Sequence, residues 1–186
     1  MDSALRKIGF GGAALATALV ALAASPAAPD ASAGGCGEVG EASPKSLRPA
    51  EAREATFCLI NRERAQAGKP ALDLEGKLQR AAQRHSELMA ETACFSHDCP
   101  GEGDLGDRLS SVGYLVGGLL RWAYGENIAY GTGSHGTPRA IVDAWMNSPP
   151  HRAMMLNGSF RDGGVGFAVR SGNRGYYTLD VGMRKG

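Results

Sequence analysis

Two alternating runs near the end of the chain constrain its fold most. Residues 164–170 and 176–181 alternate with a period of two, and the segment 171–175 between them is rich in turn-forming residues. This pattern is typical of a β-hairpin, whose two strands are antiparallel. Helical patterns come first along the chain, and the clearest pair of strands comes last. The order favours an α+β fold with an antiparallel sheet over a parallel, doubly wound one.

Four further segments carry signals for the start of a helix. The first helix is expected to begin near Pro49, and the second to follow Asp73, which would cap it. The pairs Thr137–Pro138 and Ser148–Pro149 each place a capping residue before a proline at the first helical position. His85 lies on the apolar stripe of the second helix. We interpret it as a packed, hydrogen-bonded histidine rather than a ligand.

The middle of the chain combines apolar and glycine-rich segments. Residues 105–112 predict a short helix, and residues 126–130 predict a short strand. The apolar segment 114–124 is either a buried excursion or a partly exposed apolar loop. Residues 131–136 match the G-x-G-x-x-G pattern of dinucleotide-binding proteins, but no second parallel strand follows. We interpret them as a turn between a strand and a helix.

The N-terminal residues predict export. Arg6 and Lys7 precede an uncharged apolar stretch over residues 8–24, and the small residues 31–33 supply a cleavage pattern. Residues 1–33 are therefore interpreted as a secretory signal peptide, residues 34–48 as an extension and residues 49–186 as the folded domain. A retained membrane anchor is the alternative, although the stretch is short for one. We expect a secreted protein with no transmembrane segment after cleavage.

The charge balance argues against one class of partner. The chain has 20 basic and 19 acidic residues, and its formal net charge is +1. Nucleic-acid binding relies on a positive field, which this composition does not supply. We therefore expect no nucleic-acid partner.

All four cysteines follow the predicted signal peptide, and four cysteines allow three pairings. Cys94 and Cys99 can close a short local loop, so we favour that bond. Cys36 would then pair with Cys58 by exclusion and attach the extension to the first helix. A metal cluster of Cys and His is a less favoured alternative, because a single histidine lies between the paired cysteines.

Three polar residues at separate junctions are candidates for a functional site. His97 lies in the cysteine-closed loop, Glu126 at the start of the predicted strand, and His151 in the first turn of a helix. Two imidazoles and a carboxylate suit a zinc site with an open position. Ser148 with His151 would also suit a nucleophile and its base, but the helix-cap role explains Ser148 better.

These residues lie in segments that resemble the CAP superfamily of secreted proteins. The superfamily includes cysteine-rich secretory proteins, antigen 5 and plant pathogenesis-related proteins, and the similarity is greatest to its short bacterial branch. The matching segments follow the family's order over residues 52–182: Cys58–Arg64, Phe95–His97, Gly125–Gly131, Ala144–Arg152, Gly164–Gly166 and Tyr177–Thr178.

The resemblance implies a three-layer α-β-α sandwich with a central antiparallel sheet. It also implies a cleft lined by two histidines and two glutamates, which binds a divalent metal in some members. His97, Glu126 and His151 match three of the four, so Zn2+ or another divalent metal is a possible cofactor. Ser148 stands where the second glutamate is expected, three residues after Trp145. In the alternative without metal, Glu126 is hydrogen-bonded to both histidines.

The resemblance also suggests what the protein does, although no single reaction unites the family. It favours a secreted binding module for an apolar or lipid-like ligand, or for a component of the cell envelope or a host. One alternative is a metal-assisted, peptidase-like hydrolase with Glu126 as base, and another is a structural envelope protein with a vestigial cleft. The missing second glutamate favours binding over catalysis.

Overall fold

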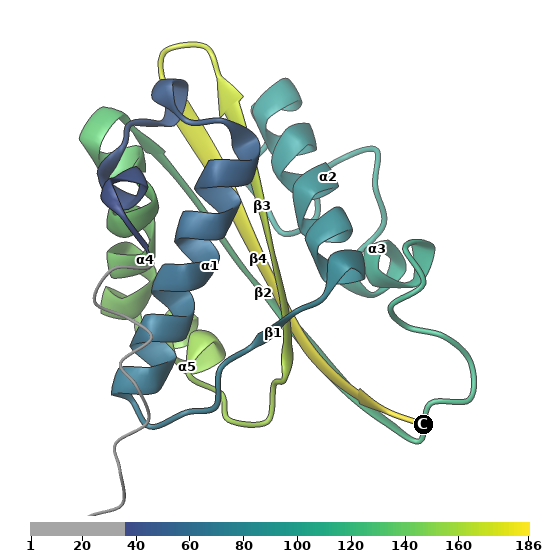
Figure 1. The fold of residues 1–186 in the computed structure, drawn as a ribbon. Helices are drawn as coiled ribbons and strands as arrows, with labels where there is room; N and C mark the ends of the chain where they lie inside the picture. The colour runs from purple at the N-terminus through teal and green to yellow at the C-terminus, as the bar shows by residue number, and fades with distance from the viewer. Residues whose placement is uncertain (1–35) are drawn as a thin grey trace, which may run out of the picture. The chain divides into compact units, whose positions relative to one another are not determined.

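The computed structural model describes residues 36–186, so the predicted signal peptide lies outside the described residues. Four strands form one sheet in the order β1-β3-β4-β2 (Figure 1). The central strand β4 (Arg174–Lys185) is antiparallel to both β3 (Asp162–Arg170) and β2 (Arg121–Thr132). The predicted hairpin is confirmed, and the strand predicted at residues 126–130 is longer than expected. The two-residue strand β1 (Asp73–Leu74) adds a parallel edge to β3.

The helices cover both faces of the sheet. Helices α1, α4 and α5 lie on one side of the sheet, and helices α2 and α3 lie on the other (Figure 1). Alternate residues of β3 show the same division. Val165 and Phe167 pack with Leu59 of α1 and Trp145 of α4, whereas Gly164 and Gly166 face α2. The expected α-β-α sandwich is confirmed. The helix bounds are α1 Pro49–Gln66, α2 Gly76–Thr92, α3 Leu105–Ser111, α4 Pro138–Asn147 and α5 Pro149–Met155.

Two glycines of β3 allow α2 to lie directly on the sheet. A Cβ atom at Gly164 would overlap the backbone nitrogen of Gln79, and one at Gly166 would overlap the carbonyl group of Ala82. Any side chain at these positions would therefore have to push the helix away from the strand. This close contact holds α2, which carries His85, against the inner strands.

The start of α2 differs from the prediction. Asp73 does not cap the helix, because it belongs to β1 and its N–H donates to the carbonyl oxygen of Arg161. The N–H of Glu75 donates in the same way to Gly163, so the chain is still extended there. Glu75 is the N-cap, and its side chain accepts a hydrogen bond of 3.0 Å from the N–H of Lys77. The parallel edge strand thus moves the start of the helix two residues along the chain.

Both expected disulfide bonds are present. Cys94 pairs with Cys99 across five residues, and Cys36 pairs with Cys58 of α1 across 22 residues. The second bond ties the extension to the domain. There the chain forms two 3-10 turns, Glu38–Glu41 and Pro44–Ser46, and the first of them packs against α1 and α4.

The apolar segment 114–124 divides into a buried and an exposed part. Tyr114 is buried beneath α2 and α3, whereas Val116, Leu120 and Trp122 are exposed. Strand β2 already begins at Arg121 within this segment. Among residues 36–186, none of the helices is long and apolar enough to cross a membrane.

Candidate functional site

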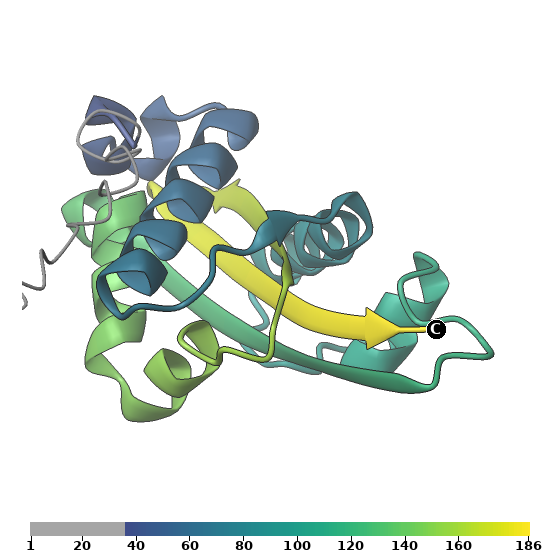
Figure 2. The same ribbon diagram turned by 60° about the horizontal axis from the view of Figure 1, so that its bottom comes forward.

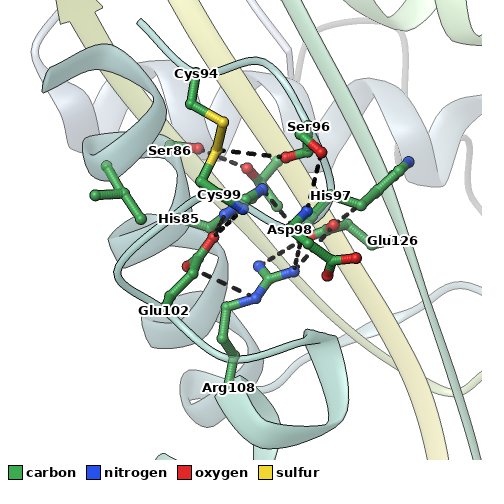
Figure 3. Close-up of polar contacts among 12 residues, drawn as sticks. His85, Ser86, Cys94, Ser96, His97, Asp98, Cys99, Glu102, Arg108 and Glu126 are labelled. Atoms are coloured by element: carbon green, nitrogen blue, oxygen red, sulfur yellow. Dashed lines mark hydrogen bonds and ion pairs between the residues drawn. A yellow bond between two sulfur atoms is a disulfide. The ribbon is translucent and has the colours of Figure 1, made fainter. Parts of the chain in front are cut away.

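Glu126 lies at the centre of a buried ion-pair network, and only 2% of its side chain is exposed. The Nδ1 atom of His97 donates to its Oε1 atom at 2.7 Å. Arg108 donates from Nη1 to Oε2 at 2.8 Å and from Nη2 to Oε1 at 3.2 Å (Figure 3). Both carboxylate oxygens therefore accept hydrogen bonds from charged or polar N–H groups.

Three separate elements bring these side chains together. Glu126 faces α2, because its Oε2 atom lies 3.9 Å from Nε2 of His85 on that helix. Its cross-strand partner Asp180 on β4 lies on the same side of the sheet. Arg108 comes from α3, and its Nη2 also donates to the carbonyl oxygen of His97 at 2.9 Å. His97 comes from the loop that the bond between Cys94 and Cys99 closes. One arginine thus fixes both the glutamate and the loop that carries His97.

His85 and Glu102 extend the network toward α2. The fully buried His85 places its Nδ1 atom 2.5 Å from Oε1 of Glu102 and its Nε2 atom 3.9 Å from Oε2 of Glu126 (Figure 3). The interpretation of His85 as a packed, hydrogen-bonded histidine is confirmed, but the sequence analysis did not place it at the site. Glu102 also lies 3.7 Å from Nε of Arg108.

Sequence reasoning missed Arg108, Glu102 and Asp180. One signal was available for Arg108, because it lies three residues after Leu105 and one before Leu109, beside the apolar stripe of the short helix. A charged residue on the inner side of a helix is expected to have a buried partner. No comparable local signal marked Asp180, which lies in a strand that is buried on both faces.

The pKa values of Asp180 and Glu126 shift in opposite directions, although the two residues are cross-strand partners. Asp180 is fully buried, and within the described part of the chain neither of its carboxylate oxygens has a hydrogen-bond partner. Burial and the neighbouring charge of Glu126 raise the pKa of Asp180 well above its ordinary value. Burial also raises the pKa of Glu126, but the hydrogen bonds from His97 and Arg108 outweigh it and leave that pKa below its ordinary value. We infer a protonated Asp180 beside an ionised Glu126.

The pKa values of His97 and His151 shift in opposite directions. The hydrogen bond to Glu126 raises the pKa of His97 above its ordinary value, despite partial burial. Burial lowers the pKa of His151, and the nearby charge of His97 lowers it further. His151 therefore keeps a neutral imidazole down to a lower pH than His97 does.

We expect proton NMR of the imidazole rings to show this split. His97 should titrate above about 6.5 and His151 below it. Replacing Glu126 with glutamine should lower the pKa of His97, whereas replacing the exposed Glu91 should leave it unchanged. The contribution of protonated His97 to stability should be complete below pH 6.5 and disappear as the pH rises through its raised pKa. A wild-type His97 that titrates at or below its ordinary value would contradict the assigned contact.

The backbone of His151 lies on the opposite side of β2 from the side chain of Glu126. Its carbonyl oxygen accepts from Nδ2 of Asn127 at 3.0 Å, and Asn127 points away from Glu126 because successive strand residues face opposite sides. The Nδ1 atom of His151 lies 2.8 Å from Oγ of Ser148. The alternative in which Glu126 bonds both histidines is therefore half correct, since it bonds His97 alone.

Ser148 also differs from its expected role. It occupies the N-cap position of α5, but its side chain makes no capping hydrogen bond and contacts His151 instead. The two prolines at the start of α5 explain this in part, because they have no N–H for the hydroxyl group to accept.

The carboxylate of Glu126, one of the three expected metal ligands, is part of the hydrogen-bond network in this structure. Both of its oxygens are engaged by N–H donors. Residues 36–186 contain no group of three or more His, Cys, Asp or Glu side chains arranged to hold a metal ion. Among the expected set of His97, Glu126 and His151, a single hydrogen bond is formed, between His97 and Glu126. His151 contacts Ser148 instead.

Comparison with known proteins identifies the family. The model of the cysteine-rich secretory protein family, CAP, matches residues 57–181. The chain belongs to the CAP family. It is 36% identical over 115 residues to the Bacillus subtilis protein YkwD, and 35% identical over 120 residues to the membrane protein YlbC of the same organism. These matches cover 62% and 64% of the chain but only 41% and 31% of the two relatives.

Solved structures show the same fold for this CAP domain. An extracellular protein of Bacillus anthracis with an SCP domain is 32% identical, with a TM-score of 0.59, over 72% of this chain and 40% of its own. A cysteine-rich secretory protein from Staphylococcus aureus is 21% identical, with a TM-score of 0.55, over 72% of this chain and 39% of its own. An outer surface protein of Borrelia burgdorferi is 19% identical, with a TM-score of 0.59, over 69% of this chain and 90% of its own. The chain thus shares the fold of a solved SCP domain as well as the family's sequence pattern.

Proposed function

We propose that this CAP domain is a secreted binding module rather than a hydrolase, and that its ligand contacts the outer edge of β2. The observation that carries the proposal is that the buried Glu126 carboxylate already accepts three hydrogen bonds, one from His97 and two from Arg108. A general base needs a free lone pair within reach of a substrate proton. A glutamate that is held in this way instead supports the loop around His97.

The side chains at this edge suit an apolar ligand with a polar group. Phe95 and Tyr130 are both half-exposed, and their rings meet edge to face with centroids 4.8 Å apart. The imidazole of His97 is also half-exposed, two residues from Phe95. Aromatic surface beside a hydrogen-bonding ring is a common composition of small-molecule sites. A lipid-like molecule with a polar head fits both.

A fluorescent fatty acid, cis-parinaric acid, tests the proposal when it is titrated into the secreted chain. We expect saturable binding that weakens about ten-fold in Phe95→Ser, because removing one aromatic contact costs about 1–2 kcal/mol. Val169→Ser, at another half-exposed apolar residue, is the matched control and should bind like the wild type. Equal affinity in Phe95→Ser and the wild type would contradict the proposed surface.

A hydrolase is the second candidate, and the contact between Ser148 and His151 favours it. Within the described residues, however, no carboxylate is hydrogen-bonded to His151, so the third group of a nucleophilic triad is missing. Zinc calorimetry on the wild type, His97→Ala and His151→Ala tests the metal-assisted version. Zinc binding that both variants abolish, together with zinc-dependent cleavage of a casein substrate, would replace the binding proposal.

A further inference from the structure

The end of the sheet far from Phe95 and Tyr130 presents a separate apolar surface. We call it the tip and define it by Val116, Leu120, Arg121 and Trp122, with Lys185 beside them. Leu120 is 83% exposed and Trp122 is 53% exposed. Trp122 lies eight residues before Tyr130, which corresponds to about 27 Å along the strand. The paired ends of β2 and β4 extend here beyond α4 and α5 (Figure 2).

The backbone holds the tip in a defined shape. The N–H of Leu120 donates to the carbonyl oxygen of Lys185 at 3.0 Å, and Arg121 and Lys185 are cross-strand partners. The indole of Trp122 stacks on Tyr124 with centroids 5.5 Å apart. Leu120 and Trp122 are therefore held by the paired strand ends and stay exposed rather than packing into the core.

The charges that residues 109–125 contribute to the tip have one sign. Residues 109–125 contain no Asp or Glu, and Arg121 is exposed within them. Lys185 adds a second cation from the neighbouring strand, whereas the next cation, Arg184, is paired with Glu75 at 2.8 Å. A positively charged rim around exposed leucine and tryptophan complements a surface that is anionic outside and apolar within.

We propose that the tip inserts into the surface of a membrane that contains anionic lipids, with Leu120 and Trp122 among the acyl chains and Arg121 and Lys185 among the headgroups. The size of the tip favours this occupant over a protein, because a stable protein interface buries about 800 Å² on each partner. Leu120 and Trp122 at the paired strand ends, with Val116 in the loop before them, supply much less. The proposal goes beyond the binding surface at the edge of β2 and does not depend on it.

The two tryptophans of the chain make the test direct. Trp145 is 1% exposed and packed in the core, so a change in emission on binding reports on Trp122. The full secreted chain is mixed with vesicles of phosphatidylcholine alone or with an equal part of phosphatidylglycerol. We expect a blue shift and co-sedimentation with the anionic vesicles, reduced at least ten-fold between 50 mM and 500 mM salt.

Substitutions separate the apolar and charged contributions. Leu120→Ser should weaken vesicle partitioning at least ten-fold, and Arg121→Glu with Lys185→Glu should remove the preference for anionic vesicles. Val169→Ser and Lys69→Glu are the matched controls elsewhere on the surface and should partition like the wild type. Phe95→Ser should also partition normally, which distinguishes this proposal from the ligand site at the edge of β2.

Two results would overturn the proposal. One is a wild type that does not partition onto either vesicle, or a Leu120→Ser variant that partitions equally well. The other is a dimer, seen by light scattering without lipid and lost in Leu120→Ser, with no vesicle binding. That result would assign the tip to contact between two copies of the chain.

Discussion

Replacing Arg108 with alanine is expected to lower the free energy of unfolding by about 3–5 kcal/mol at neutral pH. Arg108 is buried, and it forms two hydrogen bonds to Glu126 and a third to the carbonyl oxygen of His97. Its removal leaves an ionised carboxylate beside Asp180 and Glu102 with no arginine to balance it. Urea unfolding followed by circular dichroism measures the loss.

The matched control for this prediction is Arg84→Ala. Arg84 is an exposed arginine of α2 in the same part of the domain, and its loss should change stability by less than about 0.5 kcal/mol. Glu126→Gln combined with Arg108→Ala should cost less than the two single changes together, because the double variant buries no unpaired charge. Equal losses in Arg108→Ala and Arg84→Ala would show that the network does not carry a buried charge.

Gly166→Ala is expected to cost about 3 kcal/mol of unfolding free energy, although it adds a single methyl group. The added Cβ atom would overlap the carbonyl group of Ala82, so α2 and β3 must separate. Both atoms of that carbonyl belong to the backbone and cannot move away as a flexible side chain could. Because His85 lies on α2, its contacts with Glu102 and Glu126 should loosen as well.

Gly117→Ala is the matched control for the glycine prediction. It makes the same chemical change at a position where an added Cβ atom meets no other atom within 4 Å. Thermal unfolding of both variants should therefore show a loss for Gly166→Ala alone. Similar melting temperatures for the two variants would contradict the direct contact between helix and sheet.

The parts of the fold that depend on local patterns were predictable. The hairpin and the start of α1 at Pro49 follow from alternation and from a proline signal within a few residues. Strand β1 was not predictable, because its two residues acquire their structure from pairing with β3 almost ninety positions later. That pairing also explains why Asp73 does not cap α2.

The site was predictable where family motifs mark it and not elsewhere. His97 and Glu126 meet as hydrogen-bonded partners, but the position of His151 across the sheet edge depends on which way each residue of β2 faces. Arg108 and Glu102 lie between the motifs, so only the folded arrangement shows that they complete the network. A sequence motif therefore predicts the residues that it contains, but not the hydrogen-bond and ion-pair partners that lie outside it.

The position of β4 in the sheet has a consequence for how the domain is made. Strand β4 pairs with both β2 and β3, yet its residues are the last of the four strands to be synthesised. Until residues 174–185 emerge, β2 has no neighbour to bond with, and β3 has only the two residues of β1. The sheet is therefore completed after synthesis of the domain rather than during it.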